Sequence, residues 1–176
     1  RALVLSGNFQ IRAAKNLSSE LGNLSVGLFG NAKMHSPVDI TNEVLKIVKE
    51  SKADCIVSFG GGSTIGLGKA IALRTNLPQF AIPTTYAGSE VTSILGQTEN
   101  GIKTTTKNLK ILPEYVIYDP ELTLSLPLNF SITSGLNAIA HAAEGLYAKE
   151  GNPITKIMAI EGLKALRNAL PEIVKN

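Results

Sequence analysis

Residues 55–75 read CIVSFGGGSTIGLGKAIALRT, and they pass from a short apolar run through consecutive glycines into a helical stretch. The run at 55–59 predicts a buried β-strand, and the stretch at 63–75 predicts a helix. Glycines let a backbone approach a phosphate without a Cβ in the way, and a helix start supplies free N–H groups and a positive dipole end. We therefore interpret Gly60, Gly61, Gly62 and Ser63 as a phosphate-binding loop, in which Ser63 caps the helix and donates its hydroxyl to a phosphate oxygen.

This loop does not meet the two strict phosphate-loop patterns. Gly60-x-Gly62 is followed by Gly66, one position late for the dinucleotide fingerprint GxGxxG. Gly68-Lys69 is followed by Ala70, where phosphate-loop NTPases have Ser or Thr. A tight structural turn is therefore the alternative interpretation. In either case, Gly66 and Gly68 are expected to let the helix lie close to the sheet.

The first half of the chain alternates short apolar runs with helical periodicity. Runs at 2–5, 25–29, 55–59 and 80–82 predict strands. Apolar residues at helical spacing between them predict helices at 11–21, 40–48 and 63–75. This order implies an α/β fold with a parallel sheet and helices on both faces.

The pattern changes after residue 90. Segments 91–95 and 102–106 flank the turn-rich stretch 96–101 and predict a hairpin, and 115–118 predicts another strand. From residue 131 the signal is helical: one helix has an apolar face, and a second at 154–170 is ended by Pro171. We expect an α/β dinucleotide-binding domain at 1–127 and the beginning of a C-terminal helical domain at 128–176. The expected apolar face of the first helix consists of Leu136, Ile139, Ala140, Ala143 and Leu146.

Composition excludes several classes of protein. Apolar residues make up 44% of the chain and charged residues 18%, which is typical of a packed domain and not of a disordered one. The net charge of +3 comes without a basic run, so we expect no nucleic-acid partner. No apolar run approaches the roughly 20 residues of a membrane span. The single cysteine, Cys55, is interpreted as a small buried hydrophobe, which fits the cytoplasm. Because the chain opens at Arg1 without a Met, we expect both ends to be cut from a longer protein.

A second polar loop follows the strand at 80–82. It runs Pro83-Thr84-Thr85-Tyr86-Ala87-Gly88-Ser89-Glu90. The carboxyl ends of strands are where α/β sheets bind ligands, so these hydroxyls are candidates for the same site. An ordinary polar loop is the alternative.

The predicted helix that begins near residue 131 carries a possible functional group of side chains. Asn137 and His141 are four residues apart and share one helix face, and Glu144 lies near it. Asp in place of Asn137 would indicate two metal ligands, but a neutral carboxamide is a poorer ligand for a divalent cation. A packed or surface histidine is the alternative for His141, and His35 lies in a loop.

These motifs occur together in one known family. Five motifs carry the resemblance: GGGS at 60–63, PTT at 83–85, GSE at 88–90, DP at 119–120 and Gly135-x-x-Ala138-x-x-His141-x-x-Glu144. With them, the chain resembles the iron-containing alcohol dehydrogenase family over nearly its whole length. The resemblance implies an active site between an α/β nucleotide-binding domain and a helical domain. It places the cofactor's pyrophosphate on Gly61, Gly62 and Ser63. It also implies that Thr84, Thr85, Ser89 and Thr92 line the cofactor and that Lys103 reaches its ribose.

One departure concerns the metal. Metal-dependent members of the family place Asp at position 137 and His at 141, with further histidines in helices beyond residue 176. Asn137 agrees instead with metal-independent reductases of the family. The resemblance therefore implies an NAD(P)H-dependent reductase of a small dicarboxylate that requires no metal and forms a homodimer. Its catalytic candidate is His141, with Asn137 and Tyr86 as neutral donors. The alternatives are a metal-dependent alcohol dehydrogenase, a nucleotide-binding fragment without activity, and a carbocyclic lyase such as dehydroquinate synthase.

A second departure concerns the choice of cofactor. NAD-preferring members often carry Asp after the first strand, where it binds the ribose hydroxyls and repels a 2′-phosphate. This chain has Ser6-Gly7 there, with Arg12 a little later. We therefore assign Ser6 to the cofactor site and expect NADPH to be accepted as well as NADH.

Overall fold

The computed structural model describes residues 1–175 as two compact units. The first unit comprises residues 1–84 and 88–123, and the second comprises residues 85–87 and the chain from Leu124 onward. Asn176, the last residue of the predicted helical region, lies outside the described residues.

The first unit is built on a parallel sheet of five strands in the order β2-β1-β3-β4-β7. Its register places Leu3 between Gly27 of β2 and Ile56 of β3, and Phe59 opposite Ile82 of β4. The predicted α/β class with a parallel sheet is confirmed. The strands are β1 (Ala2–Leu5), β2 (Ser25–Phe29), β3 (Cys55–Gly60), β4 (Gln79–Pro83) and β7 (Tyr115–Val116).

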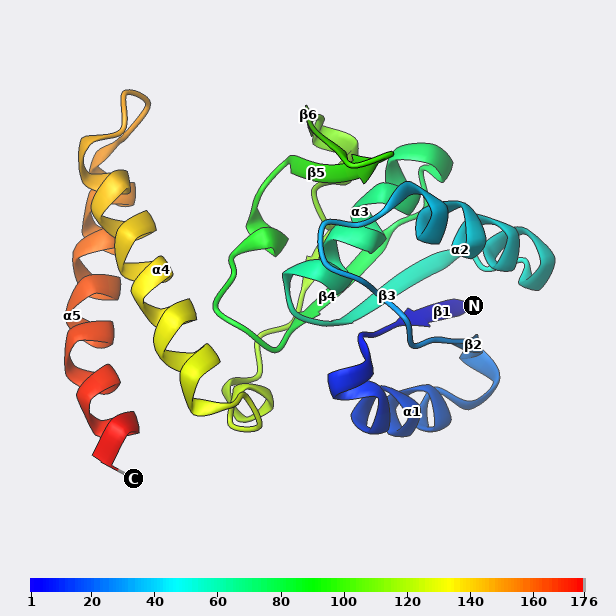
Figure 1. The fold of residues 1–176 in the computed structure, drawn as a ribbon, viewed down its shortest axis with the longest axis horizontal. Coiled ribbons are helices and arrows are strands. Elements are labelled where there is room, and N and C mark those ends of the chain that lie inside the picture. The colour runs from blue at the N-terminus through cyan, green and yellow to red at the C-terminus, as the bar shows by residue number, and fades with distance from the viewer. Residues whose placement is uncertain (176) are drawn as a thin grey trace. The chain divides into compact units, whose positions relative to one another are not determined.

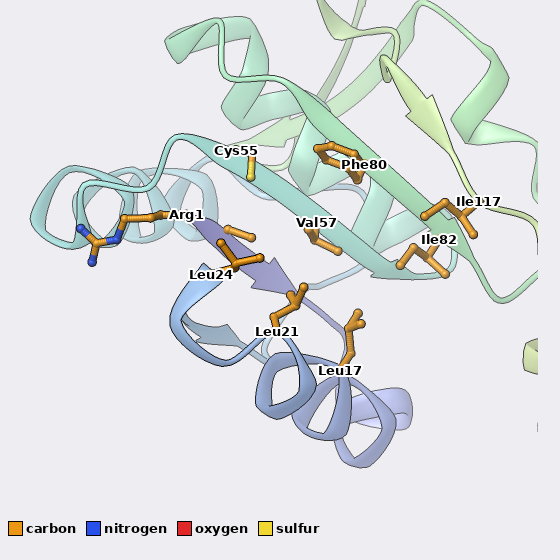
Figure 2. Close-up of a pocket in the computed structure, with 10 residues that line it drawn as sticks. Arg1, Leu17, Leu21, Leu24, Cys55, Val57, Phe80, Ile82 and Ile117 are labelled. Atoms are coloured by element: carbon orange, nitrogen blue, oxygen red, sulfur yellow. The ribbon is translucent and has the colours of Figure 1, made fainter.

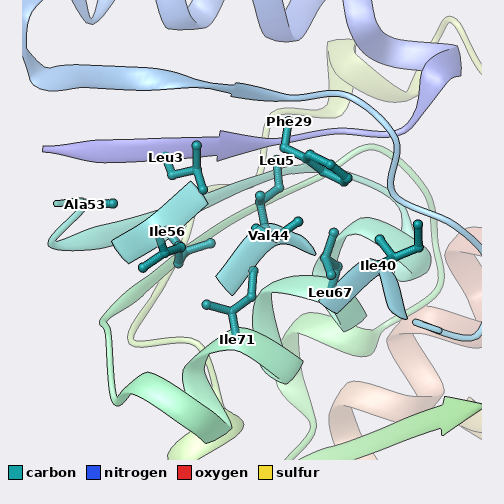
Figure 3. Close-up of a cluster of buried hydrophobic side chains, with 10 residues drawn as sticks. Leu3, Leu5, Phe29, Ile40, Val44, Ala53, Ile56, Leu67 and Ile71 are labelled. Atoms are coloured by element: carbon teal, nitrogen blue, oxygen red, sulfur yellow. The ribbon is translucent and has the colours of Figure 1, made fainter. Parts of the chain in front are cut away.

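Helices cover both faces of this sheet (Figure 1). Helix α1 (Ile11–Glu20) lies on one face, whereas α2 (Val38–Ser51) and α3 (Gly62–Thr75) lie on the other. Alternate residues of each strand point to opposite faces. On β1, for example, Leu3 and Leu5 pack against α2 and α3, whereas Val4 packs with Ala14 of α1. Figure 3 shows the larger of these clusters, in which Val44 and Leu67 meet the strand residues.

The hairpin is formed by β5 (Ile94–Glu99) and β6 (Ile102–Lys107). The predicted hairpin is therefore correct, but its predicted turn at 96–101 is too long. The turn consists of Asn100 and Gly101, whose φ values of 49° and 78° suit a tight two-residue hairpin turn. Val91 belongs to a 3₁₀ turn instead of the strand. Leu95 fixes the hairpin to the first unit by packing with Ala70 and Ile111.

Short 3₁₀ helices complete the first unit. Their bounds are η1 (Asn8–Gln10), η2 (Gly22–Leu24), η3 (Ser89–Val91), η4 (Leu109–Ile111) and η5 (Pro120–Thr123).

The second unit contains two packed helices, α4 (Leu128–Tyr147) and α5 (Pro153–Lys175). The predicted apolar face of α4 is wrong in part, because Leu136 is 55% exposed whereas Ser131 and Gly135 are buried. Leu170 lies so close to Gly135 that a Cβ on Gly135 would overlap the Leu170 side chain. The contact therefore requires a residue without a side chain at position 135. The predicted end at Pro171 is also wrong. A proline removes one helical hydrogen bond, and here the last turn continues past it to Lys175.

Candidate cofactor site

The order of the strands identifies one edge of the sheet as a binding site. From β1 the chain crosses through α1 to β2 on one side, and then through α2 to β3 on the other side of β1. The carboxyl ends of β1 and β3 therefore form the point at which strand order reverses, where open α/β sheets bind ligands. The segments Ser6-Gly7 and Gly60-Gly61 follow these two ends.

The glycine loop has a backbone that side chains would disturb. Gly60 has a φ of 156°, and a Cβ on it would overlap the side chain of Thr64. Helix α3 begins at Gly62 with Gly61 as its N-cap, and no side chain caps it. The free N–H groups of this first turn fit a pyrophosphate, and Thr64 fills the position that a Cβ on Gly60 would need.

The predicted capping role of Ser63 is wrong. Ser63 is the second residue of α3, one position after Gly62. Gly61 takes the N-cap position because its extended backbone lets its carbonyl accept from Thr64 N at 3.0 Å and from Ile65 N at 3.1 Å. Ser63 keeps its predicted position in the loop, where it is partly exposed.

Gly68 confirms the expected close approach of the helix to the sheet. A Cβ on Gly68 would overlap the hydroxyl of Ser58 and lie 3.3 Å from Gln79 Oε1, so β3 and β4 both face this position. Gly66 differs, because the side chain that a Cβ would meet belongs to Ser36, in the loop before α2.

The segment after β1 lies against the glycine loop. Ser6 is fully buried, and its hydroxyl donates to the carbonyl of Gly7 at 3.1 Å. A Cβ on Gly7 would lie 3.9 Å from Thr64 Oγ1. Thr64, which is 2% exposed, thus stands between both strand ends. The sequence prediction missed Thr64, although its position directly after GGGS was a usable signal.

Thr84 joins the same edge of the sheet. Its N–H donates to the carbonyl of Gly60 at 3.2 Å. Its hydroxyl is buried and has no hydrogen-bond partner among the described residues. A buried hydroxyl without a partner is costly, so a polar ligand at this edge would gain a ready donor or acceptor. This orphan hydroxyl is a second observation that fits a dinucleotide.

The other predicted cofactor residues of the first unit lie farther along the chain. The carbonyl of Ser89 in η3 accepts from Thr92 N at 3.3 Å and from Thr92 Oγ1 at 3.2 Å. The hydroxyl of Thr92 also accepts from Lys69 Nζ at 3.0 Å, so internal contacts already engage it. Lys103 lies on β6 opposite Thr98 and is exposed.

Beneath this segment lie two buried ionisable side chains that the sequence prediction missed. Lys69 is fully buried, and Glu90 is 5% exposed. Burial lowers the pKa of Lys69 to about 8, opposed by the charge of Glu90. Tyr118 is 62% exposed, and its hydroxyl donates to Glu90. Partial burial, followed by the charge of Glu90 and this hydrogen bond, raises the pKa of Tyr118 to about 12. A lysine inside the apolar stretch 65–72 was the available signal.

The predicted catalytic residues all belong to the second unit. Tyr86, like Thr85, lies in segment 85–87 and is partly exposed. Asn137 and His141 are exposed on α4, and His141 Nδ1 is 3.8 Å from Glu144 Oε2. Within residues 1–175, no three His, Cys, Asp or Glu side chains are grouped so that they could hold a metal ion.

Comparison with known proteins decides the family. The profile described as "Iron-containing alcohol dehydrogenase" matches residues 1–120. The profile described as "Fe-containing alcohol dehydrogenase family, C-terminal" matches residues 131–176. The chain belongs to the iron-containing alcohol dehydrogenase family.

Several members of this family resemble the chain closely. Maleylacetate reductase of Rhizobium sp. (strain MTP-10005) is 61% identical over 173 residues, which cover 98% of this chain and 49% of that protein. The crystal structure of maleylacetate reductase from Agrobacterium tumefaciens matches with a TM-score of 0.94 and 61% identity, covering 98% of this chain and 49% of that one. The chain therefore spans about half the length of these relatives.

A more distant match is to a structure that was solved with a cofactor. Sulfoacetaldehyde reductase from Bifidobacterium kashiwanohense, in complex with NAD⁺, matches with a TM-score of 0.93 and 25% identity, covering 99% of this chain and 53% of that one. The comparison supports an NAD-binding oxidoreductase family with the predicted fold.

A separate apolar pocket of about 310 Å³ lies on the face of the sheet that carries α1 (Figure 2). Leu17 of α1 and Leu21, directly after α1, face Val57, Phe80 and Ile82 of the sheet across it. Its lining is almost entirely hydrocarbon, so it does not fit the charged end of a dinucleotide. No helix among residues 1–175 is both long enough and apolar enough to span a bilayer.

Proposed function

We propose that the protein to which this chain belongs reduces maleylacetate to 3-oxoadipate with NADH or NADPH, as part of the catabolism of aromatic compounds. The observation that carries this proposal is the 61% identity, over 98% of the chain, to a protein named maleylacetate reductase. The glycine loop and the orphan hydroxyl of Thr84 support a dinucleotide at the carboxyl edge of the sheet.

The reaction requires a bound dinucleotide, and named residues of this chain are candidates to hold it. The bound dinucleotide supplies a hydride to the carbon–carbon double bond next to the substrate's ketone. Gly61, Gly62 and Ser63 would hold the pyrophosphate on the N–H groups of the first turn of α3. Thr84, Thr85, Ser89 and Thr92 would line the cofactor, and Lys103 would reach its ribose.

Hydride addition beside a ketone builds negative charge on the ketone oxygen. The site must therefore place donors or cations near that oxygen and near the two carboxylates of the substrate. His141 is our candidate for the charged or proton-donating group, with the side-chain amide of Asn137 and the hydroxyl of Tyr86 as neutral donors. Exposure of His141 and Asn137 on α4 leaves these side chains accessible to a ligand.

The decisive experiment follows the loss of NADH absorbance when the full-length protein receives maleylacetate. Turnover that depends on both compounds is the expected result. NADH binding without turnover would favour a nucleotide-binding protein of another function, and turnover of simple alcohols alone would favour an alcohol dehydrogenase.

We further propose that catalysis requires no metal. Asn137 supplies a neutral amide where a carboxylate would favour a divalent cation. Metal analysis and turnover after exhaustive chelation test this proposal. Stoichiometric iron or zinc whose removal abolishes activity, and whose return restores it, would support the metal-dependent alternative.

NADPH is proposed as a second cofactor because Ser6-Gly7 carries no acidic side chain that would repel a 2′-phosphate. The kcat/KM values for NADH and NADPH test this proposal in the full-length protein. A preference for NADH above about a hundredfold, equivalent to roughly 2.7 kcal/mol, would contradict it.

We also propose a cytoplasmic homodimer. The mass of the full-length protein in solution, measured by light scattering, tests the oligomeric state, and fractionation of the source cells tests the location.

A further inference from the structure

We propose that Lys69 is a positioning residue for the cofactor: its buried ammonium ties the segment 88–94 to helix α3, the helix that begins at the phosphate loop. This inference rests on the proposed cofactor site. It adds to that site a residue that lies beneath it and that need not touch the ligand.

The geometry of Lys69 supports this role. Its Nζ donates to the carbonyl of Thr92 at 2.7 Å, to Thr92 Oγ1 at 3.0 Å and to the carbonyl of Ile94 at 3.1 Å. An ammonium has three N–H donors, so these contacts use all of them. The side chain is fully buried. Burial of a charge is costly unless hydrogen bonds compensate it, which makes this arrangement sensitive to the loss of any partner.

The segment that Lys69 holds contains two predicted cofactor residues. Gly88 has a φ of 71° and starts the 3₁₀ turn η3, which contains Ser89. The hydroxyl of Thr92 donates back to the carbonyl of Ser89 at 3.2 Å. Contacts therefore run from Lys69 through Thr92 to Ser89, and they link the middle of α3 to the second cofactor loop.

The protonation state of Lys69 determines whether these contacts can all exist. A neutral amine has two N–H donors and one lone pair. To keep a third contact, the Thr92 hydroxyl would have to donate to Nζ, and it could then no longer donate to the carbonyl of Ser89. Deprotonation therefore removes either one contact of Lys69 or the hydrogen bond from the Thr92 hydroxyl to Ser89, whose carbonyl still accepts from Thr92 N. Because the pKa of Lys69 is lowered to about 8, this change falls within an accessible pH range.

Few other charges act on Lys69. Glu90 of η3 favours the ammonium, and the hydroxyl of Tyr118 donates to Glu90. The charged side chains of α2, of β5 and of η4, which also pack against α3, are exposed. The ionisation of Lys69 is therefore set mainly by its burial and by Glu90.

The test measures NADH affinity of the full-length protein by fluorescence titration across pH. We expect Lys69→Met to raise the Kd at about pH 7 by about tenfold or more. We expect the wild-type Kd to rise about threefold to tenfold between about pH 7 and pH 9, and the Kd of the variant to stay flat over that range. Lys107→Met removes an exposed lysine from β6 and is the matched control, expected to keep both the affinity and the pH profile of the wild type.

A second readout uses no cofactor. Hydrogen exchange in the peptide that contains residues 88–94, corrected for intrinsic pH dependence, should show lost protection in Lys69→Met and in the wild type above about pH 9. If the variant does not fold, the wild-type exchange and affinity profiles still test the positioning role of Lys69. A wild type that binds NADH with an affinity independent of pH would overturn this inference alone, and so would a variant with unchanged Kd. A wild type that binds no NADH would overturn both this inference and the proposed function.

Discussion

The phenolic hydroxyl of Tyr118 donates a 3.0 Å hydrogen bond to Oε1 of Glu90, a carboxylate that is only 5% exposed. The other oxygen of this carboxylate, Oε2, is buried and has no hydrogen-bond partner among the described residues. The hydrogen bond from Tyr118 therefore compensates in part for the burial of the Glu90 carboxylate. This pair fastens η3 to the chain that follows β7.

Removal of the hydroxyl in Tyr118→Phe is expected to lower the free energy of unfolding by about 1–2 kcal/mol, because it leaves a buried carboxylate with less hydrogen bonding. Urea denaturation of the wild type and the variant measures this change. Tyr115→Phe is the matched control, since Tyr115 is about as exposed as Tyr118, at 57% against 62%, and its ring stacks on Phe80 at a centroid distance of 4.6 Å. We expect that control to change stability by less than about 0.5 kcal/mol. Equal effects of the two variants would contradict the role given to the Tyr118 hydroxyl.

The same pair predicts an unusual tyrosine titration. Because the pKa of Tyr118 is raised to about 12, its phenolate absorbance should appear later than that of an ordinary tyrosine, and Tyr118→Phe should remove this late step. The folded state holds this proton more tightly than the unfolded state does. Its contribution to stability is therefore fully present below about pH 10 and is lost as pH rises from about 10 to about 12. Titration of the tyrosine absorbance checks the assignment. If Tyr115→Phe removed the late step, that step would belong to Tyr115 and not to Tyr118.

Much of the fold could be predicted because it depends on local patterns. The strands at 2–5, 25–29 and 55–59 are apolar runs that the parallel sheet buries, and the helices between them carry apolar residues at helical spacing. The start of β5 could not be predicted in this way. Val91 suits a strand by composition, but Gly88 turns the backbone and the chain forms η3 before β5 begins at Ile94.

Only those residues of the candidate site that belong to a sequence motif could be predicted. Gly60, Thr84 and Ser6 meet at the edge of the sheet because their strands do, which the order of strands and helices already implied. The roles of Lys69 and Glu90 depend on contacts between α3 and a segment that lies about twenty residues later, and the sequence pattern does not specify such contacts. The face of α4 escaped prediction for a related reason: Leu170 of another helix occupies the space at Gly135.

Two glycine substitutions in helices should have opposite effects. Gly68→Ala is expected to destabilise the protein by about 1–3 kcal/mol, because the new Cβ would overlap Ser58 Oγ and crowd Gln79 between α3 and the sheet. Gly162→Ala in α5 places its Cβ in open space and should stabilise the protein by roughly 0.5–1 kcal/mol, since alanine favours the helix. Urea denaturation of both variants measures these changes. A stabilising Gly68→Ala would mean that α3 is not held close to β3 and β4.

Gly60→Ala tests the phosphate loop directly. The new Cβ would overlap the side chain of Thr64 and would require an alanine at a φ of 156°, so we expect the Kd for NADH in the full-length protein to rise about tenfold or more. Gly27→Ala is the control for backbone strain, since Gly27 has a similar φ of 148° in β2 and no atom near its Cβ position. Both variants should lose stability, but only Gly60→Ala should lose affinity for NADH. Comparable Kd values for the two would indicate a structural turn instead of a phosphate loop.

His141→Ala tests the assignment of the catalytic group. A side chain that stabilises or protonates the ketone oxygen in the transition state should contribute about a hundredfold or more to kcat/KM, with most of the loss in kcat. The affinity for NADH should change little, because the candidate residues for the cofactor lie in other segments of the chain. His35→Ala is the matched control: His35 is exposed in the loop before α2, and its loss should leave kcat/KM unchanged. Steady-state kinetics of the full-length protein with maleylacetate measure both effects. A kcat/KM for His141→Ala within about threefold of wild type would remove His141 from the mechanism and leave Asn137 and Tyr86 as the donors to be tested.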